Sequence, residues 1–158
     1  MNRRVGFASQ RWREMVEAEH AQSQRAVGQS SPPDDFWEPL AEAFRADPGR
    51  TDDPLVQRLL RHVEPHHTLI DVGAGGGRLA LPLSLGCRHV VAVEPSASMG
   101  AVLQEEARRA HRDNVTLLQS TWEEAEVAPA DLVLCVQVLY TVKEVEAFVR
   151  KMEAHARE

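Results

Sequence analysis

The chain has 158 residues, which suits a single domain that buries about 70% of the surface its unfolded form exposes. Its formal net charge of −6 argues against a nucleic-acid backbone as the main partner, because such binding relies on clustered lysine and arginine side chains. No apolar run approaches the ~20 residues that cross a bilayer, the N-terminus lacks a leader-like stretch, and Cys87 and Cys135 have neither metal-ligand nor redox spacing. We therefore expect a cytoplasmic protein with reduced thiols and no membrane partner.

The first third of the chain predicts an N-terminal part in front of the main domain. Residues 2–27 are charged with sparse apolar positions, which favours a weakly amphipathic helix. The turn formers of residues 28–35 favour a linker. We therefore divide the chain into an N-terminal helix and linker over 1–35 and a main domain over 36–158.

Two short helices are expected at the start of this main domain. Asp34 or Asp35 is placed to cap a helix over 36–45, and Asp53 followed by Pro54 is typical of a helix start. The apolar face of the first helix consists of Phe36, Trp37, Leu40 and Phe44. The buried stripe of the second consists of Val56, Leu59, Leu60 and Val63.

From Thr68 onward the chain alternates apolar strands with helices, which predicts an α/β fold with a doubly wound, mostly parallel sheet. The strands are continuous apolar runs, as expected when both faces of a sheet are covered. Pro82 is unfavourable inside a helix, so we expect the first of these helices to be short or kinked. The expected strands are 68–72, 89–93, 115–119 and 131–136. The expected helices are 77–85, 97–111 and 143–156.

A glycine-rich turn joins the first of these strands to its helix. It holds Gly76 within the pattern Asp71-x-Gly73-x-Gly75-x-Gly77. Glycine permits positive φ and lets a ligand come close to the main chain, while the N–H groups at the start of the helix attract anionic groups. A second acid, Glu94, ends the next apolar run. Both acids are therefore expected at the carboxyl edge of the sheet, where open α/β sheets bind ligands, and a nucleotide-like ligand is predicted.

Taken in this order, the glycine turn, Glu94 and the segment DLVLCVQVLYTV over 131–142 resemble the cofactor-binding part of the class I S-adenosylmethionine-dependent methyltransferases. The resemblance implies a Rossmann-like sheet in the order 3-2-1-4, S-adenosylmethionine as cofactor, and methyl transfer to an unidentified acceptor. A small-molecule acceptor is favoured by the acidic charge.

The resemblance also implies a task for each part of the site. The glycine turn passes under the methionyl group, Asp71 lies beside its amino group, and Glu94 accepts hydrogen bonds from the ribose hydroxyls. The residues implied to contact the cofactor are Asp71, Gly73, Ala74, Gly75, Gly77, Glu94, Pro95, Ser96, Met99, Thr121, Trp122, Glu123, Val136 and Gln137.

The loop after the third strand departs from the family pattern, in which an acidic residue directly follows the strand. Thr121 and Trp122 occupy that place, and Glu123 follows one or two positions late as an acceptor for the adenine amino group. Trp122 either stacks on the adenine or packs the loop, and both alternatives stay open. Gln137 and Tyr140 are expected near the transferable methyl group as weak candidates for acceptor positioning, and no catalytic residue is assigned.

Two other functions compete with methyl transfer. A dinucleotide-binding turn that starts at Gly73 needs a small residue at position 78, where this chain has Arg78, so that function is disfavoured. A non-catalytic module that binds S-adenosylmethionine or a protein partner is the remaining alternative. His62, His66 and His67 precede the first strand on the side opposite the ligand, so a solvated loop is expected there and no metal site.

The family's sheet has seven strands in the order 3-2-1-4-5-7-6, and the resemblance accounts for only the first four here. The strand over 131–136 would then have an open apolar edge, which invites pairing with another chain. Three explanations compete. The chain is a fragment of a longer protein, it completes its sheet by forming a homodimer through this edge, or its sequence ends too early. We favour a fragment or a truncated product.

Overall fold

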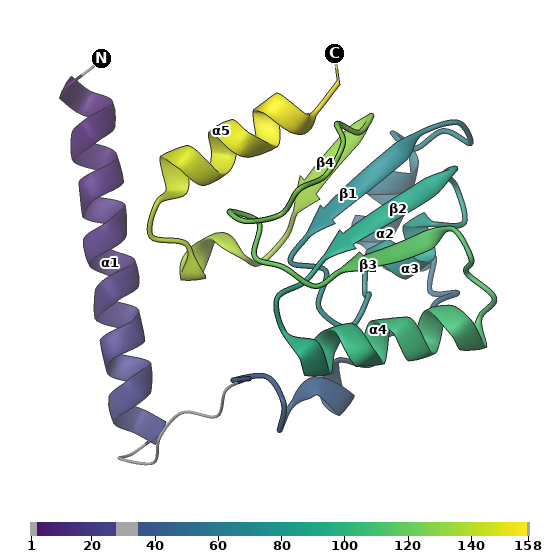
Figure 1. Cartoon of the computed structure of the whole chain (residues 1–158), viewed down its shortest axis with the longest axis horizontal. Helices are drawn as coiled ribbons and strands as arrows, with labels where there is room; N and C mark the ends of the chain where they lie inside the picture. The colour runs from purple at the N-terminus through teal and green to yellow at the C-terminus, as the bar shows by residue number, and fades with distance from the viewer. Residues whose placement is uncertain (1–2, 28–34, 158) are drawn as a thin grey trace.

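The computed structural model describes residues 3–27 and 35–157, whose centre is a parallel sheet (Figure 1). Within these residues the sheet has four strands in the order β3-β2-β1-β4, which confirms the predicted fold class and strand order. The strands are β1 (Thr68–Val72), β2 (His89–Val93), β3 (Val115–Leu118) and β4 (Leu132–Cys135).

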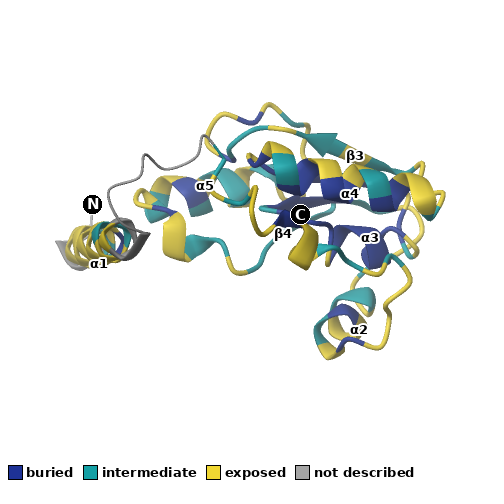
Figure 2. Cartoon of the chain, turned by 90° about the horizontal axis from the view of Figure 1, so that it is seen from below, coloured by how far each residue is buried: buried dark blue, intermediate teal, exposed yellow. Residues whose placement is uncertain are grey.

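Helices cover both faces of the sheet. Successive side chains of each strand point to opposite faces, so apolar strands present two apolar faces that must be buried. Leu69 of β1 packs in one apolar cluster with α2 (Pro54–Leu60), α3 (Ala80–Leu83) and α4 (Ala97–Arg109). Ile70 packs in a second cluster with α5 (Val145–His155). Figure 2 shows the central strands and α3 in dark blue, between partly exposed helices. The doubly wound arrangement is therefore built from two separate cores.

The predicted helix over 36–45 is wrong in its extent. Residues 36–40 form turns, and only η1 (Ala41–Phe44) is helical, as a single 3-10 turn. Pro39 has no backbone N–H to donate to the carbonyl of Asp35, so an α-helix cannot continue through this position. The chain uses shorter-range bonds here, from Glu38 N to Asp35 O and from Leu40 N to Trp37 O.

The other helix signals are confirmed. The Asp53 side chain accepts hydrogen bonds from the backbone of Leu55 and Val56 at the start of α2. The Ser96 hydroxyl accepts from Met99 N and caps α4. α3 has only four residues and contains Pro82, so the predicted short helix is observed.

α1 (Arg3–Val27) stands beside the sheet and contacts α5 and the turn that follows β4 (Figure 1). The Trp12 indole N–H donates to the Val142 carbonyl at 2.8 Å, and Val16 is buried. The predicted linker contains residues 28–34, including Asp34, that lie outside the described part; the division of the chain at residue 35 stays a prediction. Among the described residues, no helix has the length and apolar character needed to cross a bilayer.

Candidate cofactor site

A cavity of about 570 Å³ lies at the carboxyl ends of β1, β2 and β4. This is the edge of the sheet where the sequence places the ligand. The cavity brings together most of the predicted contact residues, namely Asp71, Gly73, Ala74, Gly75, Glu94, Pro95, Met99, Val136 and Gln137, together with Tyr140. The predicted residues outside its lining are Gly77, Ser96, Thr121, Trp122 and Glu123.

Glycine is required at the positions of the turn for different structural reasons. Gly73, Gly75 and Gly77 all have positive φ, which favours glycine. A Cβ at Gly77 would collide with Leu81, and one at Gly76 would collide with the Phe44 carbonyl oxygen. A Cβ at Gly75 would meet nothing within 4 Å, so this residue alone of the four turn glycines presents open backbone. Gly75 is therefore the point where a ligand can approach the turn most closely.

Glu94 is buried and fixes the turn from the neighbouring strand. One carboxylate oxygen accepts from Gly75 N at 2.7 Å, and the other accepts from Ser96 N at 2.9 Å. Burial raises the pKa of Glu94, while these two backbone hydrogen bonds act in the opposite direction. Each oxygen keeps a further lone pair, so the carboxylate is suited to accept hydrogen bonds from a ligand in the cavity.

Asp71 is the most unusual polar group in this cavity. It is 2% exposed, and its Oδ2 atom has no hydrogen-bond partner among the described residues. Burial raises the pKa of Asp71 to about 7; the negative charge of Glu94 raises it too, while the Ala80 backbone amide lowers it. A buried acceptor without a partner costs about 1–3 kcal/mol, so this atom is suited to receive a donor from a ligand.

Seven lining residues lie outside the predicted contact set, namely Trp37, Phe44, Gly76, Arg78, Leu79, Val138 and Thr141. Five of them belong to the glycine turn or to the segment after β4, where contacts were predicted, whereas Trp37 and Phe44 come from a part of the chain where none was predicted. They were expected only on the apolar face of a helix. The position of Trp37 depends on Asp35, whose carboxylate accepts hydrogen bonds from Ser96 and Ser98 at the start of α4. The signal in the sequence was the aromatic pair itself, but the contact that brings it to the cavity joins residues about 60 positions apart.

The loop after β3 lies outside the cavity. Trp122 is 3% exposed, its indole N–H donates to the Phe148 carbonyl of α5, and its ring lies edge-on to that of Phe148. Of the two alternatives for Trp122, the structure therefore agrees with the second, in which the side chain packs the loop. The ring fills the core beneath α5. The Thr121 hydroxyl bonds Glu124 within the loop, and Glu123 is exposed. Ser96 and Gly77 shape the cavity without lining it. Ser96 caps α4, and Gly77 gives the glycine turn its conformation.

The segment after β4 forms the opposite wall. Gln137 has φ of 59°, which is rare for a residue with a side chain and marks a sharp change of chain direction. Gln137, Val138, Tyr140 and Thr141 all line the cavity, and Tyr140 is half-exposed. The two weak candidates for acceptor positioning are therefore at the cavity. Their role stays a prediction.

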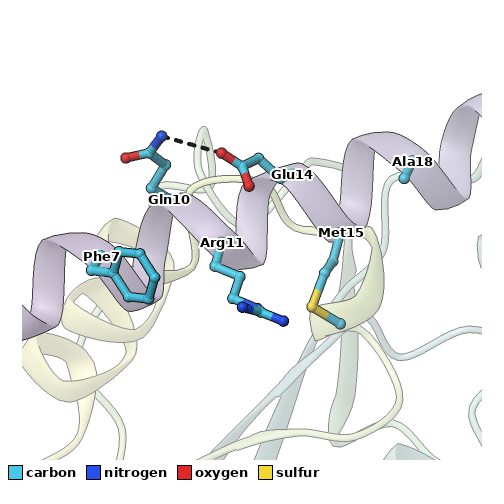
Figure 3. A pocket seen from close by; sticks show the side chains of 6 residues that line it. All are labelled: Phe7, Gln10, Arg11, Glu14, Met15 and Ala18. Atoms are coloured by element: carbon cyan, nitrogen blue, oxygen red, sulfur yellow. Dashed lines mark hydrogen bonds between the residues drawn. The ribbon is translucent and has the colours of Figure 1, made fainter.

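Two other features lie away from this cavity. The side chains of Glu64, His66 and His67 gather before β1, where the His67 ring accepts from Glu64 N. A hollow of about 340 Å³ runs along α1 beside Phe7, Arg11 and Met15, and Gln10 bonds Glu14 on the same face (Figure 3). This hollow is lined by a single helix and has no buried carboxylate.

Residues 70–158 match the family model described as "Methyltransferase domain". The chain belongs to this family. The match covers more than half of the chain and includes the glycine turn, Glu94 and the segment after β4. The methyltransferase resemblance predicted from the sequence is confirmed.

Individual proteins are similar to this methyltransferase domain in sequence or in structure. The ubiquinone biosynthesis O-methyltransferase of Rickettsia akari (strain Hartford) is 28% identical over 109 residues, which are 65% of this chain and 42% of that protein. A candidate S-adenosyl-L-methionine-dependent methyltransferase from Methanococcus maripaludis has a TM-score of 0.67 at 16% identity, over 83% of this chain and 64% of that one. The magnesium protoporphyrin IX methyltransferase of Synechocystis PCC 6803, solved with bound SAM, has a TM-score of 0.59 at 21% identity, over 87% and 66%. The chain thus spans less than half the length of the curated relative.

Proposed function

We propose that the cavity binds S-adenosylmethionine and that the protein transfers its methyl group to a small-molecule acceptor. The unpartnered Asp71 Oδ2, buried beside the glycine turn, carries this proposal. An ammonium group is the donor that such an oxygen needs, since it supplies both a hydrogen bond and the charge that offsets burial. The methionyl part of S-adenosylmethionine has that group.

The charge of the cavity supports the same ligand. Two buried carboxylates, Asp71 and Glu94, line it, and the pKa of each is raised by burial. Arg78, which also lines the cavity, pairs with Asp53 at 2.9 Å. A ligand with an ammonium and a sulfonium group reduces the repulsion between the two acids. The pyrophosphate of a dinucleotide increases it.

Each part of the wall has a task under this proposal. The open backbone at Gly75 lets the methionyl group lie against the turn, Asp71 accepts from its ammonium, and Glu94 accepts from the ribose hydroxyls. When bound, the cofactor supplies a methyl group already activated on sulfur. The chain then needs to orient the acceptor and exclude water, and well-aligned reactants gain effective molarities of about 10⁵–10⁸ M. Gln137 and Tyr140 lie on the wall where an acceptor would be held.

A small molecule is the acceptor class that we favour. The net charge of −6 opposes binding to nucleic acid. The names of two matched proteins, for ubiquinone biosynthesis and for magnesium protoporphyrin IX, support the same acceptor class. The cytoplasmic location stays part of the proposal.

Isothermal titration calorimetry with S-adenosylmethionine and with NAD tests the proposal. We expect micromolar binding of the first and none of the second. Gly75→Val, which fills the open backbone position, and Glu94→Ala, which removes the expected ribose acceptor, should both abolish binding. Binding of NAD, or equal affinity of both variants and the unmodified chain for S-adenosylmethionine, would overturn the proposal.

A further inference from the structure

The segment from Asp35 to Phe44, which we call the strap, covers the side of the cavity formed by α4. Trp37 is the strap residue that both lines the cavity and packs against α4, where it adjoins the buried side chains of Met99 and Val102. Glu94 and Met99 line the same cavity. The Trp37 indole therefore lies in the wall of the same cavity as Glu94, the expected ribose acceptor. Ser96 links the two residues, since its backbone N–H donates to Glu94 and its hydroxyl donates to Asp35, which also accepts from Trp37 N.

One end of the strap is fixed by the Asp35 carboxylate. It accepts hydrogen bonds from Trp37 N, from the Ser96 hydroxyl, and from both the backbone N–H and the hydroxyl of Ser98, at 2.7–3.0 Å. Burial raises the pKa of Asp35, but these hydrogen bonds outweigh burial and lower the pKa to about 2. The carboxylate is therefore charged at neutral pH and joins the strap to the start of α4.

The other end of the strap is fixed at the glycine turn. The Phe44 carbonyl lies against Gly76, where no Cβ would fit. The next residue, Arg45, forms ion pairs with Glu105 and Glu106 of α4. Because both ends are held, the position of the Trp37 ring does not depend on its own packing alone.

We propose that the Trp37 indole is the surface on which the adenine ring of the cofactor packs, with Asp35 as its positioning residue. This inference rests on the proposed function. Adenine is bonded to ribose, so a ribose at Glu94 keeps the base inside the same cavity, where Trp37 is an aromatic residue of the wall. Trp122 is not available for this role, since it is buried under α5.

Tryptophan fluorescence tests the inference, because the chain has three tryptophans and only Trp37 lines the cavity. Trp12 packs on Val142 and Trp122 lies in the core. Titration with S-adenosylhomocysteine, a stable probe with the same adenosyl group, should change the emission of the unmodified chain. Trp37→Phe should abolish that change and Trp12→Phe should keep it, while calorimetry shows that both variants still bind the probe.

Affinity gives a second readout. Trp37→Ala should raise the Kd for S-adenosylhomocysteine about ten-fold, in the range found when an aromatic side chain under a base is removed. Leu40→Ala is the matched control, since Leu40 is a half-exposed strap residue outside the cavity lining, and its Kd should stay within about two-fold. Circular dichroism establishes that each variant is folded.

The outcomes separate this inference from the proposed function. Binding of the probe with an emission change that persists in Trp37→Phe, or an unchanged Kd in folded Trp37→Ala, would overturn the role of Trp37 and leave the cofactor site standing. Absence of binding to the unmodified chain would overturn the proposed function, and the role of Trp37 with it.

Discussion

At the scale of single residues, two carboxylates divide the work of the cavity. Glu94 already has two backbone partners, whereas one oxygen of Asp71 has none in the part of the chain that the structure describes. Glu94 thus holds the turn before any ligand arrives, and Asp71 is left as the acceptor that a ligand satisfies. The sequence predicted both acids at this edge. It could not predict that only one of them lacks a partner, because that depends on the position of the amides around each group.

Asp71→Asn should separate stability from binding. Above pH 7 the variant lacks a buried negative charge without a partner, so its free energy of unfolding should rise by about 1 kcal/mol in urea titrations. Its affinity for S-adenosylhomocysteine should fall at least ten-fold, because a charge-assisted hydrogen bond is lost. A variant that loses stability and keeps its affinity would contradict the role given to Asp71.

The same residue predicts a pH dependence. The pKa of Asp71 is about 7 in the fold against an ordinary value of 3.8, so the folded state binds more protons than the unfolded state between these values. The contribution of Asp71 to stability is therefore fully present below about pH 4 and is lost as the pH rises through 7. Affinity for the ammonium group should change in the opposite sense and weaken as the pH falls below 7. Calorimetry from pH 6 to 8 should show this slope in the unmodified chain, and a profile as steep in Asp71→Asn would exclude Asp71 as its source.

Glu94→Gln tests the second acid. The amide cannot accept at both positions, so one of the bonds to Gly75 and Ser96 should be lost and the Kd for S-adenosylhomocysteine should rise at least ten-fold. Glu123→Gln is the matched control, because Glu123 is exposed and outside the cavity lining, and its affinity should not change. Equal effects of the two substitutions would show that overall charge, and not position, determines binding.

At the scale of elements, the short connections around the sheet position the site. The sequence predicted α2, α3 and α4 well, since Asp53, Pro82 and Ser96 act through local backbone rules. It failed for the strap, where Pro39 prevents an α-helix and Asp35 bonds a distant helix start. A sequence pattern shows a local effect such as that of Pro39, but it does not show that Asp35 bonds to the start of α4. For this reason the place of Trp37 at the cavity was not predicted.

α1 should stabilise the wall after β4. Trp12→Phe removes the hydrogen bond to the Val142 carbonyl and should lower the free energy of unfolding by about 1 kcal/mol in urea titrations. Phe7→Ala changes the exposed face of the same helix and should alter that free energy by less than about 0.5 kcal/mol. If the two substitutions cost the same, α1 contributes through its helical content and not through this contact.

At the scale of the whole molecule, the alternation of strands and helices was sufficient to predict a parallel sheet covered on both faces. The order β3-β2-β1-β4 came from the family resemblance, and the structure confirms it. Within the described residues, β4 pairs with β1 and with no other strand, and Ala130, just before β4, forms a backbone bridge to Ala156. Such an edge of apolar residues can pair with a further strand.

A homodimer joined through this edge stays the alternative to a fragment or truncated product, and it has a direct test. Sedimentation velocity over a range of concentrations should show a reversible monomer–dimer equilibrium, and the amides of β4 should exchange more slowly at high concentration than at low. A single monomeric species throughout, or protection that appears only elsewhere, would exclude pairing through β4.

A crystal structure with bound S-adenosylhomocysteine tests the central claim most directly. We expect the ligand's ammonium nitrogen at about 2.8 Å from Asp71 Oδ2, its carboxylate against the glycine turn and its ribose hydroxyls at Glu94. An Asp71 oxygen that stays without a partner while the ligand binds elsewhere would contradict the account.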